Sequence, residues 1–294
     1  MKLINFYNQV VRFGRLADPR KAKQEIKSFP DSAILFGDPN LEIKKIMVGI
    51  DIEVAELLLA DRIRQKEGLD LVIAHHPEGK AYAGLHEVMR LQIDLLTQAG
   101  VAQKTASRLV QERMSEVQRR VLPQNHTRPV DAARLLNMPY MNMHTPADNH
   151  VYRYLEAIFK QKSSLSLSLG DALKILNTIP EYQIASKFNT GPQIISGNPK
   201  RLVGKILFEM TGGTEGSKDV FYKLYKAGVR TLISMHLSEE HFKKVKDANL
   251  NVIIAGHISS DTLGLNLLLD NIEKYAKQNF QVIECSGFTR IKRK

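Results

Sequence analysis

The stretch Leu71-Val72-Ile73-Ala74-His75-His76-Pro77 sets the frame for the whole sequence. Four consecutive apolar residues are typical of a buried strand in a parallel sheet, and Pro77 forces that strand to end. Successive strand side chains point to opposite faces, so two adjacent histidines can act together only where the strand gives way to a loop. Ligands of open α/β sheets bind beyond the carboxyl ends of the strands. We therefore expect His75 and His76 to belong to a binding site.

The segments around this stretch predict alternating strands and helices. Residues 45–50 are expected to form a strand and residues 52–67 an amphipathic helix, which complete a βαβ unit with the strand at 71–74. The second half of the chain repeats this plan, because its apolar strands end at His236 and His257. The pattern predicts an α/β fold with two lobes. Each lobe would be a mixed or parallel sheet flanked by helices, with a metal site in the cleft between them.

The boundary between the lobes is expected in the irregular middle of the chain, where glycine, proline and serine are frequent. The first lobe would cover residues 1–160, with a helical insertion around 85–136, and the second lobe residues 161–294. A single intertwined domain is the alternative to this division.

The composition indicates a globular protein of the reducing cytoplasm. Hydrophobic residues make up 43% of the 294 residues, enough to bury a sizeable core. No apolar run approaches the roughly 20 residues of a membrane span, and the first residues contain no signal peptide. The single cysteine, Cys285, excludes an intramolecular disulfide framework. We therefore expect a cytoplasmic location and no membrane partner.

The chain carries a formal net charge of +11. Such a charge attracts nucleotides, nucleic acid or other anionic partners, although it is also typical of a merely solvated surface. An apolar stripe at helical spacing predicts a helix that includes positions 104 to 120. The other sides of this helix are basic, through Lys104, Arg108, Arg113, Arg119 and Arg120. That helix is either an ordinary surface helix or one that contacts an acidic partner or a neighbouring subunit.

Three short segments combine histidines with carboxylates in a way that suits a metal site. They are His75-His76, His144-x-x-x-Asp148 and His257-x-x-x-Asp261. A four-residue gap places both side chains on one face of a helical turn. Imidazole and carboxylate ligands suit zinc, iron, manganese or nickel, and six such groups exceed what one tetrahedral ion needs. The set therefore predicts two divalent metal ions per chain, bridged by a carboxylate.

Each segment also has an ordinary structural explanation, because isolated histidines and carboxylates often cap helices or form hydrogen bonds. His236 ends a strand and is a further candidate to approach the site. The glycine-rich turn at residues 211–217 has two explanations. It either offers backbone N–H groups to a phosphate or is a tight turn that needs positive φ angles.

These segments together resemble a known family, the NGG-interacting factor 3-like proteins, which are often described as GTP cyclohydrolase I type 2 homologues. The resemblance covers most of the chain. It depends on Val48-Gly49-Ile50-Asp51, on Leu71 to Pro77, on His144-Thr145-Pro146-Ala147-Asp148, on Lys205 to Gly216 and on Ala255 to Asp261. Asp261 stands where the family usually has glutamate.

The resemblance implies a two-lobed α/β fold, a dinuclear metal centre in the cleft, and a homo-oligomer, commonly a hexamer. The metal ligands that it implies are His75, His76, Asp148, His257 and Asp261. His144 would lie in or beside the coordination shell and is the tentative catalytic residue.

Taken together, the sequence predicts a dinuclear metal-dependent hydrolase. Its substrate would be an anionic small molecule, either nucleotide-like or otherwise phosphorylated, and the resemblance suggests a GTP cyclohydrolase-type activity. His144 or His236 would transfer protons, with a pKa suited to neutral pH. The alternative is a non-catalytic oligomeric factor that binds metal or nucleic acid.

Overall fold

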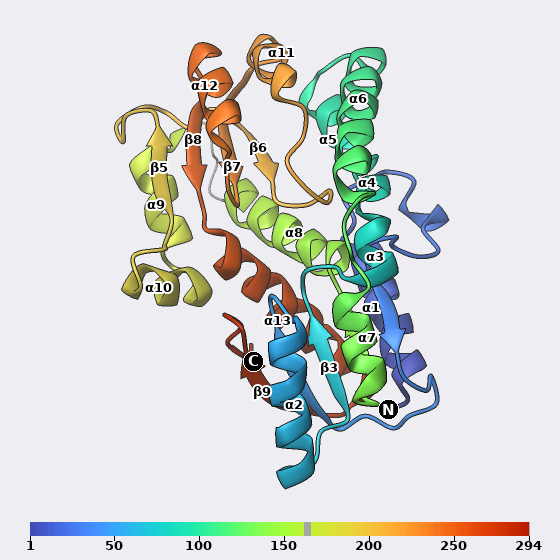
Figure 1. Ribbon diagram of the computed structural model, residues 1–294. Helices are drawn as coiled ribbons and strands as arrows, with labels where there is room; N and C mark the ends of the chain where they lie inside the picture. Colours follow the sequence, from blue (N-terminus) through green and yellow to red (C-terminus); the bar gives the residue numbers. More distant parts are fainter. Residues whose placement is uncertain (162–165, 294) are drawn as a thin grey trace.

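The strands form two separate sheets in the computed structural model, which describes residues 1–161 and 166–293 (Figure 1). The first sheet has the strand order β1-β4-β3-β2-β9, and only its edge strand β1 is antiparallel to its neighbour. The bounds are β1 Ala33–Phe36, β2 Lys45–Gly49, β3 Leu71–Ala74, β4 Tyr140–Asn142 and β9 Gln281–Cys285. All four residues of the central strand β3 are buried, which confirms the strand predicted from the apolar run.

The second sheet follows the same plan with the strand order β5-β8-β7-β6. Its edge strand β5 is antiparallel to β8, whereas β8, β7 and β6 are parallel. The bounds are β5 Gln193–Ser196, β6 Lys205–Glu209, β7 Val229–Ser234 and β8 Asn251–Ile254.

Helices cover both faces of each sheet. Sheet one packs on α1, α8 and α13 on one face and on α2 and α7 on the other. Sheet two packs on α8, α9 and α10 on one face and on α6, α11 and α12 on the other. The helix bounds are α1 Leu3–Ala17, η1 Lys23–Glu25, α2 Val54–Glu67, α3 Gly79–Ala83, α4 Leu85–Val88, α5 Leu91–Ala99, α6 Gln103–Val121, α7 Arg128–Leu135, α8 Thr145–Gln161, α9 Leu169–Leu176, α10 Pro180–Lys187, η3 Lys218–Val220, α11 Phe221–Lys226, α12 Glu239–Asp247 and α13 His257–Ala276.

Helices α8 and α13 form a layer that the two sheets share. Figure 1 shows them crossing the centre of the molecule, with one sheet on either side. The two helices approach closely because position 264 has no side chain: a Cβ atom on Gly264 would lie 2.6 Å from the carbonyl oxygen of Ala147. The first turns of both helices are therefore held side by side, in the cleft between the sheets.

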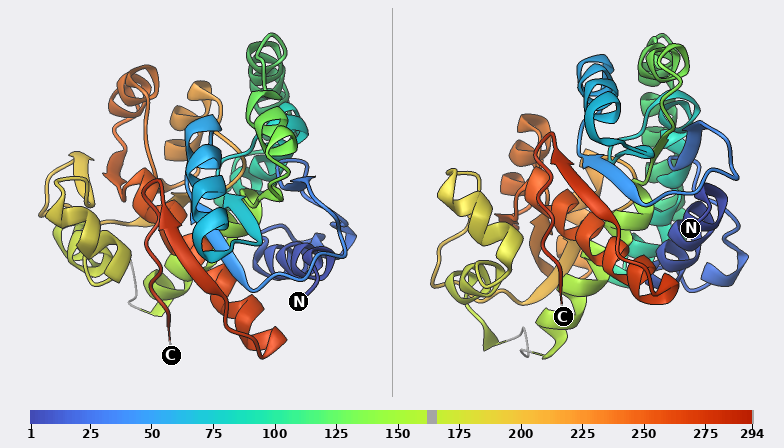
Figure 2. Two further views of the ribbon diagram at one scale, coloured as in Figure 1. Left: turned by 60° about the horizontal axis from the view of Figure 1, so that its bottom comes forward. Right: turned by 90° about the horizontal axis from the view of Figure 1, so that it is seen from below.

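The fold class predicted from the sequence is confirmed: two mixed sheets, each flanked by helices, enclose a cleft. The division into residues 1–160 and 161–294 stays a prediction, and its part at residues 162–165 and 294 lies outside the described residues. Strand pairing crosses that division, because β9 lies beside β2 in the first sheet (Figure 2). Helices α4 to α7 occupy the segment predicted as a helical insertion.

The basic segment at 104–120 lies on α6, which packs through its apolar stripe against the second sheet. Two of its arginines form ion pairs within the helix, Arg108 with Glu112 at 2.7 Å and Arg113 with Glu116 at 2.9 Å. Among the described helices, none has the length and apolarity required to cross a bilayer.

Candidate metal centre

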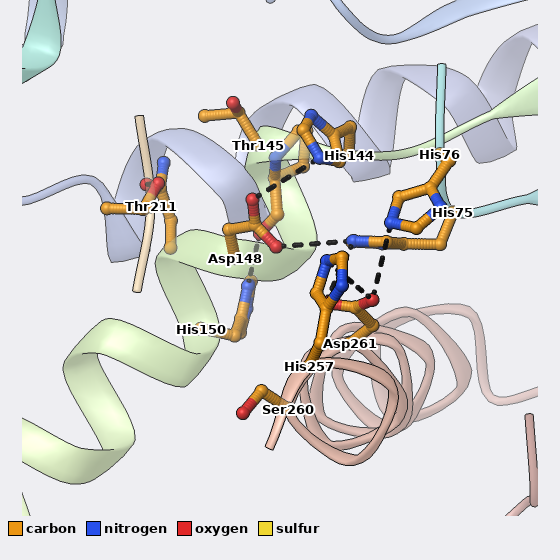
Figure 3. A network of polar contacts seen from close by, with 12 residues as sticks. His75, His76, His144, Thr145, Asp148, His150, Thr211, His257, Ser260 and Asp261 are labelled. Atoms are coloured by element: carbon orange, nitrogen blue, oxygen red, sulfur yellow. Dashed lines mark hydrogen bonds and ion pairs between the residues drawn. The ribbon is translucent and has the colours of Figure 1, made fainter. Parts of the chain in front are cut away.

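The end of β3 places two histidines at the cleft. The backbone N–H of His75 donates to the carbonyl of Gly49 at 2.9 Å, and that of His76 to the carbonyl of Ile50 at 3.0 Å. These bonds extend the pairing with β2 just past the strand end. The backbone then turns, so both imidazoles reach the same cluster (Figure 3).

The first turn of α8 supplies a histidine and a carboxylate. The N–H of Asp148 donates to the carbonyl of His144 at 3.1 Å, so the two residues lie on one face of a helical turn, as their spacing predicts. His144 is oriented from behind by Asp31, whose Oδ2 lies 2.8 Å from the imidazole Nδ1. Asp31 is fully buried and also accepts a hydrogen bond from the hydroxyl of Thr145 at 2.6 Å. The Nε2 atom of His144 therefore faces the cluster.

The first turn of α13 supplies the third pair, His257 and Asp261. Gly256 precedes the helix with a φ angle of +105°, a conformation that side-chain-bearing residues rarely adopt, and it turns the chain sharply from β8 into α13. Asp261 is only 1% exposed, whereas the His257 side chain is about half-buried.

The six side chains converge on one region of the cleft (Figure 3). His75 Nε2 lies 3.4 Å from an oxygen of Asp148 and 3.4 Å from Oδ1 of Asp261. The other carboxylate oxygen of Asp261, Oδ2, lies 3.5 Å from Nε2 of His76 and 3.6 Å from Nε2 of His257. His144 Nε2 lies 3.8 Å from Asp148 Oδ2.

All of these distances are long for hydrogen bonds, and the two of 3.4 Å at His75 fit atoms that share an ion. Ligands held about 2.1 Å from one ion are separated by roughly 3.0 to 3.4 Å in octahedral or tetrahedral geometry. Buried polar atoms are normally hydrogen-bonded. In this cluster, however, both ring nitrogens of His75, both oxygens of Asp261 and Oδ1 of Asp148 make no hydrogen bond with any described residue. The residues present therefore fit a metal site.

The carboxylates of the cluster favour positive charge at its histidines. Burial opposes protonation of His75, but Asp261 and Asp148 outweigh burial and raise its pKa to about 10. Burial likewise opposes protonation of His76, and Asp261 and Asp51 still raise its pKa to about 9. Burial disfavours the carboxylate of Asp261, yet the neighbouring histidines hold its pKa below the usual value. A buried carboxylate pair of this kind is stabilised by protons or by a divalent ion.

Two carboxylates outside the predicted set orient the histidines. Asp31 contacts His144, as described, and Asp51 Oδ1 lies 2.6 Å from Nδ1 of His76. Metal-binding histidines commonly present their other ring nitrogen to a carboxylate, which fixes the ring and its tautomer. Asp31 carries no local sequence signal. Asp51 lies directly after the β2 segment, in the stretch Val48-Gly49-Ile50-Asp51 on which the family resemblance depends.

His236 approaches the centre without joining the cluster of ligand atoms. Its ring centroid lies 4.8 Å from that of His257, and its Nδ1 lies 3.5 Å from Oε1 of Glu215. Glu215 belongs to the glycine-rich turn, where Gly212 and Gly213 have φ angles of +104° and +86°. The tight-turn explanation of these glycines is therefore correct.

An opening of about 440 Å³ leads from the surface to His76, His144, His236 and His257. Arg128 is the one Lys or Arg in its described lining, and its guanidinium lies 3.1 Å from a carboxylate oxygen of Glu53. The lining also contains Glu78, whose pKa burial and Glu53 raise to about 7. The described lining of the opening is thus polar, and it carries no excess of basic side chains.

Comparison with known proteins agrees with this fold. No protein-family model and no curated protein matches the sequence. Among solved structures, an NIF3 superfamily protein from Sphaerobacter thermophilus is 28% identical, with a TM-score of 0.79 over 95% of this chain and 98% of that one.

More distant structures share the fold. A hypothetical protein of Staphylococcus aureus, SA1388, is 12% identical with a TM-score of 0.52 over 97% of this chain and 96% of that one. The protein ybgI, of unknown function, is 13% identical with a TM-score of 0.52 over 97% and 98% of the two chains.

Fold and site together define an α/β protein with a histidine–aspartate cluster, able to hold metal, in the cleft between two sheets. Within that class, the comparison supports the NIF3 superfamily, which confirms the resemblance recognised in the sequence.

Proposed function

We propose that the protein is a metal-dependent hydrolase with a dinuclear centre. One observation carries the proposal: buried carboxylate oxygens and imidazole nitrogens from three segments converge, and several of them lack any hydrogen bond. The proposed ligands are His75, His76, His144, Asp148, His257 and Asp261.

The two carboxylate oxygens of Asp261 divide these ligands into two groups. Oδ2 lies nearest His76 and His257, whereas Oδ1 lies nearest His75, which in turn contacts Asp148. Asp261 would therefore help to hold metal with both groups, and His144 would complete the second group through Nε2. Divalent ions in such a centre lower the pKa of water toward neutrality and polarise the bond to be cleaved.

The proton-transfer role is better assigned to His236 than to His144. The contact of His144 with buried Asp31 orients its Nε2 toward the cluster, as expected for a ligand. His236 lines the opening and is held by Glu215 through Nδ1, so Nε2 is the ring nitrogen that would exchange a proton with a substrate or with water.

The resemblance suggests a nucleotide-like or phosphorylated substrate. It also suggests a homo-oligomer, commonly a hexamer. We place the protein in the cytoplasm. The described lining of the opening does not support a phosphorylated substrate, because its single arginine, Arg128, is paired with Glu53. The alternative of a nucleic-acid-binding factor is not favoured by α6, where two of the arginines are paired with glutamates. Size-exclusion chromatography with light scattering tests the oligomer.

Elemental analysis of the purified protein tests the proposed centre. We expect about two equivalents of zinc, iron, manganese or nickel per chain, and no more than about one in the Asp261→Asn and His75→Ala variants. His86→Ala is the matched control, since His86 lies on α4 away from the cluster, and it should retain both ions. Metal below about 0.2 equivalents in the wild-type protein after gentle purification and reloading would contradict the proposal.

A further inference from the structure

A second cavity lies on the other side of His257. It has a volume of about 720 Å³ and is enclosed by α10, the first turns of α13 and residues 284–291. This volume is within the range of pockets that bury most of a drug-sized molecule. His257 lines this cavity as well as the small space of about 50 Å³ beside the metal cluster. A molecule bound in the cavity therefore reaches a proposed metal ligand.

The wall of the cavity is largely apolar. Aliphatic and aromatic side chains contribute most of it: Ile184, Ala185, Phe188, Ile258, Phe288 and Ile291. Phe188 is 73% exposed and Ile258 40% exposed, although both are large apolar residues. Such side chains gain free energy when an apolar surface covers them.

The wall contains no Lys or Arg within the described residues, and its carboxylates are already engaged. Glu181 is 2% exposed, and its two oxygens accept hydrogen bonds from the guanidinium of Arg293 at 2.9 and 2.7 Å. Glu284 accepts the backbone N–H of Arg290 at 2.8 Å. An anionic group held against this wall, away from His257, would thus be buried without a Lys or Arg partner, which is costly.

One polar side chain in the wall has no partner. Ser259 is 8% exposed, and its buried hydroxyl makes no hydrogen bond with any described residue. Its neighbour Gly256 leaves room for that hydroxyl, since a Cβ atom there would lie 2.5 Å from the serine Oγ. An unpaired buried hydroxyl is a position where a ligand's hydrogen-bonding group is expected.

We infer that this cavity binds an uncharged, largely apolar small molecule that hydrogen-bonds to Ser259 and presents its reactive group past His257 to the metal centre. The molecule would be the substrate, so this part of the inference rests on the proposed hydrolase. It differs from the anionic, phosphorylated substrate expected from the sequence.

A pair of fluorescent probes that differ by one charge tests the inference. N-phenyl-1-naphthylamine is neutral, and 8-anilinonaphthalene-1-sulfonate has the same rings plus a sulfonate. We expect the neutral probe to bind at least about tenfold more tightly than the sulfonate, despite the net charge of +11 on the chain. Equal or tighter binding of the sulfonate, displaced by GTP, would overturn the inference.

A cavity-filling variant locates the bound probe. Ile184→Trp places an indole in the cavity and should weaken binding of the neutral probe about tenfold or more. Gln183→Trp, at the exposed neighbouring position on α10, is the matched control and should leave binding within about twofold. Unchanged binding in Ile184→Trp would overturn the assignment of this cavity.

Cys285, the only cysteine of the chain, also lines the cavity. Protection of its thiol therefore tests independently whether the probe binds there. The neutral probe should slow alkylation of Cys285 by N-ethylmaleimide, followed by intact-protein mass. If the probe does not protect the thiol, it binds outside this cavity. If Ile184→Trp changes the oligomeric state in sedimentation, a second copy of the chain covers the cavity wall. Either result overturns the inference. Metal content is measured on the same samples. A protein with two ions that fails these tests keeps the proposed hydrolase and loses only the substrate class.

Discussion

Asp31 controls the orientation of His144 although it lies outside the cluster of ligand atoms. Its Oδ2 accepts a hydrogen bond from the Thr145 hydroxyl at 2.6 Å and lies 2.8 Å from Nδ1 of the His144 imidazole. Asp31→Asn removes the charge that fixes the ring tautomer, while keeping the size of the side chain. We expect metal affinity to fall about 10- to 100-fold, measured by titration against a competing chelator.

The control for this variant is Asp247→Asn, an exposed carboxylate on α12, which should bind metal like the wild type. Far-UV circular dichroism and thermal melting separate the loss of a ligand's orientation from loss of the fold. A folded Asp31→Asn variant with unchanged metal affinity would show that His144 is not a ligand.

The sequence predicts which ligand-type residues meet, but not what orients them. His75 follows β3 of the first sheet, and His257 and Asp261 follow β8 of the second. Each therefore lies beyond the carboxyl end of a buried strand, where ligands of α/β sheets bind. Asp31 lies 113 residues before His144, and only the folded chain brings the two together. Ser259 was missed for a related reason, because the lack of a hydrogen-bond partner is a property of the fold.

At the scale of elements, the contact between α8 and α13 holds the two halves of the ligand set in place. Asp148 lies in the first turn of α8 and Asp261 in the first turns of α13, and Gly264 allows the two backbones to touch. In Gly264→Ala the added methyl would meet the Ala147 carbonyl at 2.6 Å, so the helices must separate. We expect a loss of about 1–3 kcal/mol of unfolding free energy in urea titrations, together with weaker metal binding.

Gly170→Ala at the start of α9 is the control, because its Cβ would lie 3.3 Å from the nearest atom, the Pro199 carbonyl oxygen. Its metal affinity should match that of the wild type. If Gly264→Ala proved as stable as the control, the close approach of the helices would not matter to the centre.

Three strands escaped prediction, β1, β4 and β5, and two of them, β1 and β5, are antiparallel edge strands. β1 and β5 are each four residues long and only partly buried, so they lack the continuous apolar run that marks the central strands. Their pairing depends on the neighbouring strands β4 and β8. Edge strands of this kind take their conformation from tertiary context, which a single sequence does not display.

At the scale of the whole molecule, neither predicted lobe contains all of its own core. The core of the first sheet includes Leu265, Leu268 and Ile272 of α13, and β9 completes its edge. We therefore expect fragment 1–160 alone to show no cooperative thermal transition and to bind no metal, as followed by near-UV circular dichroism.

The matched control is the full chain with a protease site inserted after residue 160 and cut after folding. It should stay assembled and melt cooperatively, because the second fragment already occupies its place in the first sheet. Cooperative melting of the isolated fragment would instead support two independent lobes.

Strand β9 is synthesised long after its partner β2, and this order affects folding during translation. The backbone of Asp51, just after β2, donates to the hydroxyl of Ser286, 235 residues further along the chain. At 5–20 residues per second, a ribosome needs roughly 10 to 50 seconds to synthesise that interval. Throughout this time the exposed edge of β2 has no strand to pair with, and His257 and Asp261 do not yet exist. The nascent chain therefore presents an unfinished sheet edge to the cell, which makes shielding by chaperones during translation an expected requirement of this fold.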